Sequence, residues 1–291
     1  MTRVRVREAQ VQQLLPGPLR MIVVAVLLLL VGAPMAYVGL ASVNSDLDVV
    51  AGEFWPSHLV LGNYVSIWST VDLGSGLLNS FIVCGAVALT CVAVSLGSAY
   101  VLVRYAFRGK AMILRGLLAL QSVPGTLLVL PVFVLFASTA NAVGVQIIGT
   151  RWALIVTYLT FALPFSTWVM VTYLRGLPAE LDEAAVIDGA TPRQILLRIV
   201  LPLSWPGMVV SGIFAFLLGW NDVLYASVLT APDTRTAAVA LQVFGATQEG
   251  GAIPPYGQLM AAALVCAVPV VALYLVFQRY LVSGLTAGGV K

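Results

Sequence analysis

The chain has 291 residues, of which 60% are hydrophobic and 9% are charged, and its mean hydropathy is +0.99. Soluble domains carry about a quarter charged residues, so the composition excludes a soluble globular protein and indicates an integral membrane protein. The formal net charge of +3 gives no indication of nucleic-acid binding, and no nucleic-acid partner is expected.

Six segments are long and apolar enough to cross a bilayer, which takes about 20 mostly apolar residues. They are residues 21–40, 77–103, 116–136, 152–174, 207–229 and 256–277. The first follows several arginines, as a signal peptide does, but its apolar run is too long and no clear cleavage site follows it. It is therefore predicted to be a retained anchor, and the fold class is predicted to be all-α with six transmembrane helices.

The segments outside these spans complete the expected organisation. Residues 1–20 form an N-terminal segment, and residues 41–76 form a polar stretch with aromatic side chains that suit a membrane interface. Residues 77–280 hold the other five spans as one core, and residues 281–291 form a C-terminal tail.

The basic residues predict the orientation of the spans. If both termini and the connections after the second and fourth spans share one side, 13 of the 15 Lys and Arg residues lie there. The exceptions are Arg151 and Arg235. Because basic residues concentrate in cytoplasmic loops, that side is predicted to be the cytoplasm, and residues 41–76 are expected outside.

The connection after the fourth span is polar but has the sequence signals of ordered helices. Pro178 can open a helix because the first helical position needs no N–H donor. Glu180, Asp182 and Glu183 follow in the first turns, where the helix dipole favours negative charge. Gly189 is placed to end this helix in a left-handed C-terminal cap.

A second helix is predicted directly after the glycine. Thr191 is the expected N-cap, Pro192 the first helical residue, and Gln194 can bond back to complete a capping box. Pro202 and Pro206 are expected to end this helix. The connection is therefore predicted to be two short helices with a glycine joint, presented outside the bilayer.

One pattern in this connection resembles the EAA loop of the permeases of ABC importers. It consists of Glu183-Ala184-Ala185, three residues, Gly189, nine residues, Ile199, one residue, and Leu201-Pro202, and every fixed position is matched. Further similar features are Asp188-Gly189-Ala190, Trp220-Asn221-Asp222 and the C-terminal sequence from Gln278 to Lys291, which resembles the tail of MalG-type carbohydrate permeases.

This resemblance implies a type I importer fold with both termini in the cytoplasm of a prokaryotic cell and the chain in its plasma membrane. Residues 176–206 would be the coupling loop that docks onto an ATPase. The implied partners are a second homologous permease, two ATPase subunits and an extracytoplasmic solute-binding protein. The chain itself would bind no cofactor, since ATP and magnesium would sit on the ATPase.

The resemblance also implies a role for the outer loop, residues 230–255. In MalG-type permeases the corresponding loop reaches the sugar cleft of the binding protein. At about 26 residues the segment is long for a helix–helix connection, and long loops tend to be functional. Gln248, Glu249 and Gly250 are therefore the candidate contacts with a binding protein, and a passive linker is the alternative.

Polar and aromatic residues within the spans are candidates for the solute pathway. Asp222 is the one ionisable residue deep in a predicted span, and such residues usually face a cavity or the bundle interior. Trp220, Asn221 and Tyr225 lie beside it, and aromatic, amide and carboxylate groups suit a polyhydroxylated solute. An equally weighted alternative is that Asp222 braces neighbouring helices.

Two further polar residues are pathway candidates in other spans. Asn79 opens the second span, where a structural hydrogen bond between helices is favoured over a pathway role. Gln121 lies with Pro124 in the third span and could mark a kink that lines the pathway.

The sequence contains no pattern that predicts a catalytic site or a metal site. It has no phosphate-binding Gly-Lys loop and no nucleophile–base set, its single histidine is His58, and its three cysteines fall in apolar runs. The sequence therefore predicts a non-enzymatic permease subunit that imports a sugar or sugar-like solute. The alternatives are import of a glycerophospho compound and a secondary transporter coupled to protons through Asp222.

Overall fold

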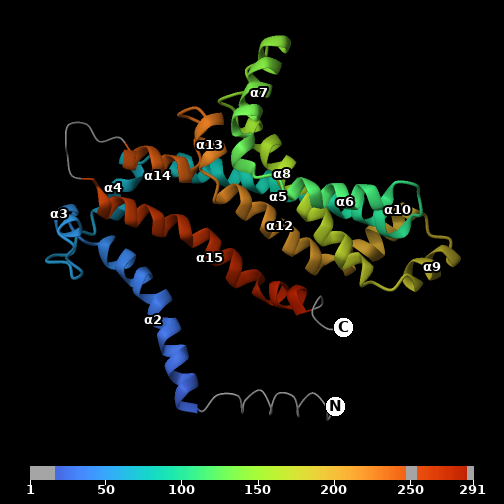
Figure 1. Cartoon of the computed structure of the whole chain (residues 1–291), viewed down its shortest axis with the longest axis horizontal. Coiled ribbons are helices and arrows are strands. Elements are labelled where there is room, and N and C mark those ends of the chain that lie inside the picture. The colour runs from blue at the N-terminus through green and yellow to red at the C-terminus, as the bar shows by residue number, and fades with distance from the viewer. Residues whose placement is uncertain (1–16, 247–253, 287–291) are drawn as a thin grey trace. The chain divides into compact units, whose positions relative to one another are not determined.

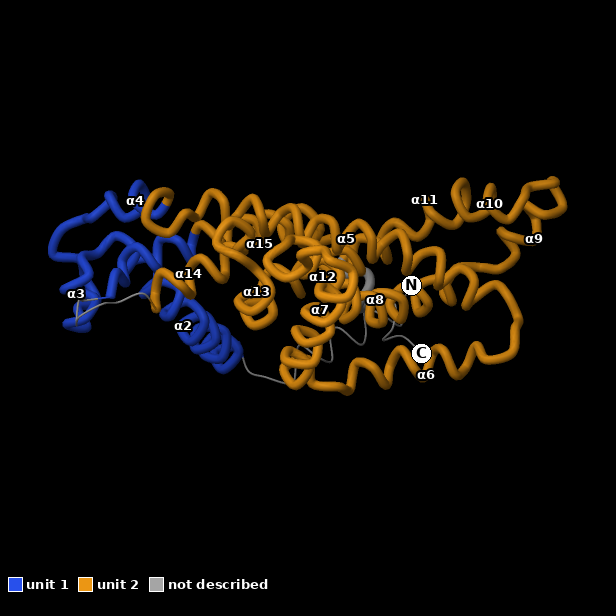
Figure 2. Tube along the Cα trace, turned by 90° about the horizontal axis from the view of Figure 1, so that it is seen from above, with its two compact units in different colours: residues 1–67, 248–264 blue, residues 68–247, 265–291 orange. Residues whose placement is uncertain are grey.

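The computed structural model describes residues 17–246 and 254–286, and the described chain is largely helical (Figure 1). Five of its helices are long and apolar enough to cross a membrane, and a bent pair of shorter helices makes a sixth candidate. The all-α membrane fold predicted from the sequence is confirmed. The chain divides into two compact units, which Figure 2 colours separately.

Unit 1, residues 1–67 and 248–264, contains α2 (Gly17–Ala41) and α3 (Asp46–Val50). The side chains of α2 are exposed along most of its length although they are almost all apolar. An apolar helix with exposed side chains is what a lipid-facing span requires. The predicted first span, residues 21–40, therefore lies within this helix.

Polar contacts order the rest of unit 1. Asn63, the first residue of α4 (Asn63–Thr70), donates through Nδ2 to two backbone carbonyls of the turn after α2, at 3.0 and 3.1 Å. The Asp46 carboxylate accepts a hydrogen bond of 2.9 Å from the backbone N–H of Gly257. Gly257 has no room for a side chain, since a Cβ there would lie 2.5 Å from Nδ2 of Asn63. The predicted outer segment is thus folded rather than extended.

Unit 2, residues 68–247 and 265–291, is built on three helices that pack together: α5 (Leu73–Arg104), α8 (Arg151–Arg175) and α12 (Trp205–Trp220). The side chains at the centre of this packing have no exposed surface, and among them are Val83, Val87, Cys91 and Leu154. The first three recur every fourth residue on one face of α5, which is the periodicity of a buried helix face.

The third predicted span, residues 116–136, is broken at Pro124, where the sequence had indicated a kink within one span. The chain forms α6 (Lys110–Gln121), then a 3₁₀ turn, η1 (Gly125–Leu128), and then α7 (Val129–Val143). Pro124 sits at the break with an extended backbone, φ −62° and ψ 114°. Proline cannot donate to the helix ladder and disfavours helical geometry in the residue before it; an average of hydropathy does not register this.

The fifth predicted span, residues 207–229, is also broken. The helix α12 ends at Trp220, and a separate short helix, α13 (Leu224–Leu229), follows after a turn. Asp222 therefore lies in a break between helices and not inside a span. The short side chains of Asn and Asp compete with the backbone for hydrogen bonds, and here Asp222 bonds to the start of α13.

The structure also differs from the prediction in the outer loop and at the end of the last span. The outer loop contains a helix, α14 (Ala237–Ala246), which packs against α5 so closely that a Cβ on Gly76 would lie 3.0 Å from the Cα of Ala237. The last helix, α15 (Tyr256–Thr286), runs beyond the predicted span into the predicted tail, residues 281–291.

Candidate functional site

The first helix of the candidate coupling loop is α9 (Glu180–Ile187). Its N-cap is Ala179, so Pro178 precedes the helix and does not open it as predicted. Asp182 and Glu183 lie with Glu180 in the first turn, where the N-terminal end of the helix dipole stabilises their charge.

Gly189 ends α9 with a left-handed backbone, φ +81°. The N–H of Ala190 donates to the carbonyl of Ala185 at 2.9 Å, and the N–H of Asp188 donates to that of Ala184 at 3.0 Å. These bonds occupy the otherwise open carbonyls at the end of the helix. The predicted glycine joint is confirmed.

The second helix begins with the predicted capping box. Gln194 accepts from the N–H of Thr191 at 2.7 Å, and the Thr191 hydroxyl accepts from the N–H of Gln194 at 3.4 Å. Pro192 is at the first turn of this helix, α10 (Pro192–Ile195). Cap, proline and box are all confirmed.

Pro202 does not end this helix as predicted. The chain widens into a π-helix, η2 (Leu196–Val200), and continues into α11 (Leu201–Leu203), in which Pro202 occupies the first turn. The N–H of Leu201 donates to the carbonyl of Leu196, five residues back, so helical hydrogen bonding continues up to the proline, which itself has no N–H to donate. The helical path turns at Ser204, and α10–α11 meets α12 at an angle of 76°.

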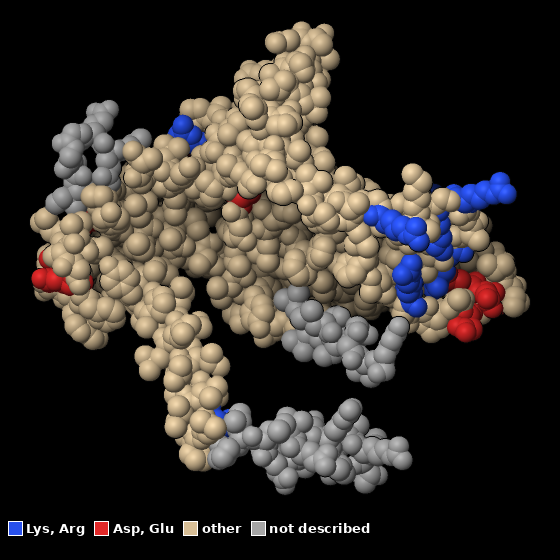
Figure 3. Space-filling model, in the orientation of Figure 1, with Lys and Arg blue, Asp and Glu red and all other residues tan. Residues whose placement is uncertain are grey.

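The candidate coupling residues divide into a buried set and an exposed set. The buried face holds α9 and α10 on the ends of α5 and α8: Ala185 and Ile195 are buried, and Ile199 and Leu201 are partly buried against the same cluster. Glu183, Ala184, Asp188, Gly189 and Pro202 are exposed. This end of unit 2 also gathers most of the charged side chains visible on that face of the unit (Figure 3).

Two exposed apolar residues of α9 were missed by the sequence analysis. Val186 is 62% exposed and Ile187 is 86% exposed, and only Asp188 separates them from the glycine joint. The available signal was their position: Ala185 faces the core, so the residues one and two places later on a helix must point away from it. With Glu183 and Asp188 they form an apolar and acidic surface.

Asp222 is partly buried and accepts three hydrogen bonds from protein groups. Its Oδ2 accepts from the Tyr158 hydroxyl of α8 at 2.7 Å and from the N–H of Ala226 at 3.0 Å, while Oδ1 accepts from the N–H of Tyr225 at 3.4 Å. The carboxylate thus caps α13 and ties it to α8. This geometry favours the bracing alternative for Asp222 over the pathway alternative.

The neighbours of Asp222 come together around the same break. Trp220 is buried and stacks on Phe216, with ring centroids 5.2 Å apart, whereas Asn221 is exposed. The Tyr225 hydroxyl donates to the carbonyl of Gly125 at 2.6 Å, which joins this break to the break in the third span. Gln121 lies nearby, and its side-chain amide donates to the carbonyl of Phe161 at 3.2 Å.

Asn79 lies apart from that group and has a structural set of contacts. Its Nδ2 donates to the carbonyls of Asp233 and Arg235 at 3.0 and 2.9 Å, and its Oδ1 accepts from Nε of Arg151 at 2.7 Å. The side chain is buried and holds the connection between α13 and α14 against α5. The remaining candidates, Gln248, Glu249 and Gly250, lie outside the described residues.

Comparison with known proteins identifies close sequence similarity to transport permeases. A family described as "Binding-protein-dependent transport system inner membrane component" matches residues 90–287. The trehalose transport system permease protein SugB of Mycobacterium tuberculosis is 34% identical over 261 residues, which cover 89% of this chain and 92% of the relative. The trehalose/maltose permease protein MalG of Thermococcus litoralis is 33% identical, covering 89% and 91%.

The fold has a solved counterpart. A chain of a bacterial ABC transporter involved in the import of the acidic polysaccharide alginate superposes with a TM-score of 0.76. The superposition covers 91% of this chain and 95% of that chain, at 18% sequence identity. At this identity the similarity establishes a shared fold.

Proposed function

This chain belongs to the family of binding-protein-dependent transport system inner membrane components, and from that premise we propose that it is the translocation subunit of an ATP-driven importer that carries a sugar into a prokaryotic cell. The observation that carries the proposal is the paired helices α9 and α10. Their inner faces are buried on the spans, while the acidic and apolar outer surface of α9 is left exposed. Such a surface is suited to dock into a cleft on another protein.

The proposed assembly supplies what this chain lacks. Two ATPase subunits in the cytoplasm bind ATP with magnesium and dock on α9, a second homologous permease completes the translocation path, and an extracytoplasmic binding protein delivers the solute. The predicted orientation supports this arrangement, because it places the coupling loop on the cytoplasmic side with 13 of the 15 basic residues.

The proposed solute class is a sugar, with a disaccharide as the first probe. Relatives at 33 and 34% identity carry names that refer to trehalose and maltose. The test is to co-express the chain with its partner subunits and measure ATP hydrolysis in liposomes with trehalose or maltose and the cognate binding protein. A complex that contains no ATPase subunit would contradict the proposal, and stimulation by a glycerophosphodiester alone would move the solute to the alternative class.

Asp222→Asn is expected to retain ATP-dependent uptake, with a weaker apparent affinity at most. The amide oxygen can still accept from Tyr158 and Ala226, but the amide nitrogen cannot accept from the N–H of Tyr225, a loss of about 1 kcal/mol. The measurement is uptake of labelled sugar by vesicles that contain the wild-type or variant complex. Loss of accumulation in the variant, with the complex intact, would support proton coupling through Asp222.

A cysteine at position 248 is expected to cross-link to the docked binding protein. The expectation follows from the family resemblance of the outer loop, in which Gln248 lies between α14 and α15. Cysteines at positions 248, 249 and 250 should each be tried with a short bifunctional reagent, and a cysteine at the exposed Arg108, predicted to be cytoplasmic, is the control. Failure at all three loop positions with transport intact would favour a passive linker.

A further inference from the structure

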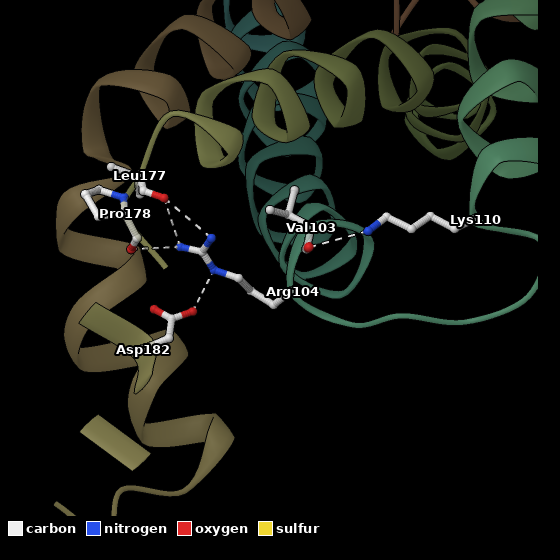
Figure 4. Close-up of polar contacts among 6 residues, drawn as sticks. All are labelled: Val103, Arg104, Lys110, Leu177, Pro178 and Asp182. Atoms are coloured by element: carbon white, nitrogen blue, oxygen red, sulfur yellow. Dashed lines mark hydrogen bonds and ion pairs between the residues drawn. The ribbon is translucent and has the colours of Figure 1, made fainter. Parts of the chain in front are cut away.

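Arg104, the last residue of α5, contacts the start of the coupling loop through several bonds (Figure 4). Its Nε lies 2.6 Å from Oδ2 of Asp182 in the first turn of α9. Its Nη2 donates to the carbonyls of Leu177 and Pro178, each at 3.4 Å. One guanidinium therefore holds both the first turn of α9 and the connection that leads into it.

The surroundings make this a stronger contact than an ordinary surface ion pair. The side chains of Arg104 and Asp182 are each only 15% exposed, so solvent screens their attraction less than it would at the surface. Lys110 directs its ammonium group to the carbonyls of Val103 and Tyr105, at 3.4 and 3.5 Å. Lys110 thus supplies a cation to the C-terminal end of α5, while the guanidinium of Arg104 is directed to the α8–α9 side.

The chain path shows why such a contact matters for α5. Movement of α9 passes along the backbone to α8 through only four residues, 176–179, and to α12 through α10 and α11. The helix α5 ends at Arg104 and has no such covalent route, although it lies at the centre of unit 2. Movement of α9 can reach α5 indirectly, through the packing of α8 and α12 on α5. A direct route runs through side chains, among them the Arg104 contacts and the apolar cluster that Ala185 shares with residues of α5.

We propose that Arg104 is a positioning residue that makes α5 move with α9 when the ATPase displaces the coupling loop. The proposal rests on the proposed function and adds the route by which the displacement enters the central helix. Guanidinium geometry is part of it, because the planar fork can bond one carboxylate and two carbonyls at once, which an ammonium group does less well.

The test uses the assembled complex with spin labels on cysteines at Val101, on α5, and Glu180, on α9. Both positions are exposed, and the background carries Cys266→Ala, since Cys84 and Cys91 are fully buried. The distance between the labels is measured without nucleotide and after trapping with magnesium, ATP and vanadate. The variants are Arg104→Gln, Asp182→Asn and the two combined, and Arg108→Gln is the matched control because Arg108 is exposed in the same connection.

In the wild type and the Arg108→Gln control, one distance peak is expected in both states, because the two helices move together. In the trapped state of Arg104→Gln, the distance between the labels should shift or broaden away from the wild-type peak. Stimulated ATP hydrolysis should fall by about tenfold. Asp182→Asn should act in the same direction, and the double variant should be no worse than Arg104→Gln, since both changes break one contact.

Three outcomes separate the explanations. If the purified wild-type complex is found to contain no ATPase subunit, the proposed function is overturned and this inference with it. An unchanged distance peak in trapped Arg104→Gln overturns the inference alone. Additive effects in the double variant also overturn it, because they would mean that each change merely loosens the fold.

Discussion

Gly189→Val is expected to abolish substrate-stimulated ATP hydrolysis while the chain still inserts and folds in the membrane. A Cβ at this position would meet no atom within 4 Å, so the obstacle is the backbone and not packing. Gly189 has φ +81°, a conformation that costs an L-residue about 1–2 kcal/mol, and a β-branched residue is among the least suited to it. The valine would reorient Val186 and Ile187 relative to α10 and so misplace the docking surface.

Two control variants distinguish an effect of backbone conformation from an effect of side-chain size. Gly189→Asn is expected to retain most stimulated activity, because asparagine visits the left-handed region more readily than other side chains. Gly116→Val lies in α6, where a Cβ also meets nothing within 4 Å and φ is not positive, and it should behave as wild type. Normal stimulated ATP hydrolysis by Gly189→Val, measured on purified complex in liposomes, would contradict the assignment of the coupling loop.

Gly219→Val is expected to lower the stability of unit 2 strongly. A Cβ at Gly219 would lie 2.9 Å from Cδ2 of Tyr158 and 3.1 Å from Sγ of Cys84. The ring of Tyr158 cannot move aside freely, since it is only 1% exposed and its hydroxyl is bonded to Asp222. Overpacking of this kind costs about 1–3 kcal/mol or more.

Thermal unfolding of the purified chain in detergent measures this effect. Gly85→Val is the matched control, because it makes the same change in α5 where a Cβ meets nothing within 4 Å. Combining Gly219→Val with Tyr158→Leu should recover part of the loss by removing the ring. Equal unfolding temperatures for Gly219→Val and Gly85→Val would contradict the tight packing of α12 on α8.

The coupling loop was the part of the fold most fully predicted from sequence, because its order depends on local chemistry. The capping box of Thr191 and Gln194 and the left-handed Gly189 are set by neighbouring residues and occur as predicted. Pro202 was misjudged because the tolerance of a proline depends on the turn around it, and the π-helix before it could not be foreseen from a proline alone.

The membrane spans were predicted less completely than the coupling loop. Hydropathy predicted that each apolar segment exists, and Pro124 indicated a kink, but neither showed that the helix stops there or that α12 ends at Trp220. Contacts between residues far apart in the sequence could not be predicted, because the sequence signals were local. No local pattern joins Arg104 to Asp182, 78 positions apart, or Tyr158 to Asp222, 64 positions apart.

Concentrative uptake tests the central claim most directly. Vesicles that contain the complete complex are loaded with ATP and given labelled trehalose or maltose with the binding protein, with and without a protonophore. Accumulation is expected to require ATP and to persist with the protonophore, because an ATPase is proposed to dock on the exposed α9 surface and to drive transport by hydrolysing ATP. Accumulation that collapses with the protonophore while ATP remains constant, and that Asp222→Asn abolishes, would contradict the account.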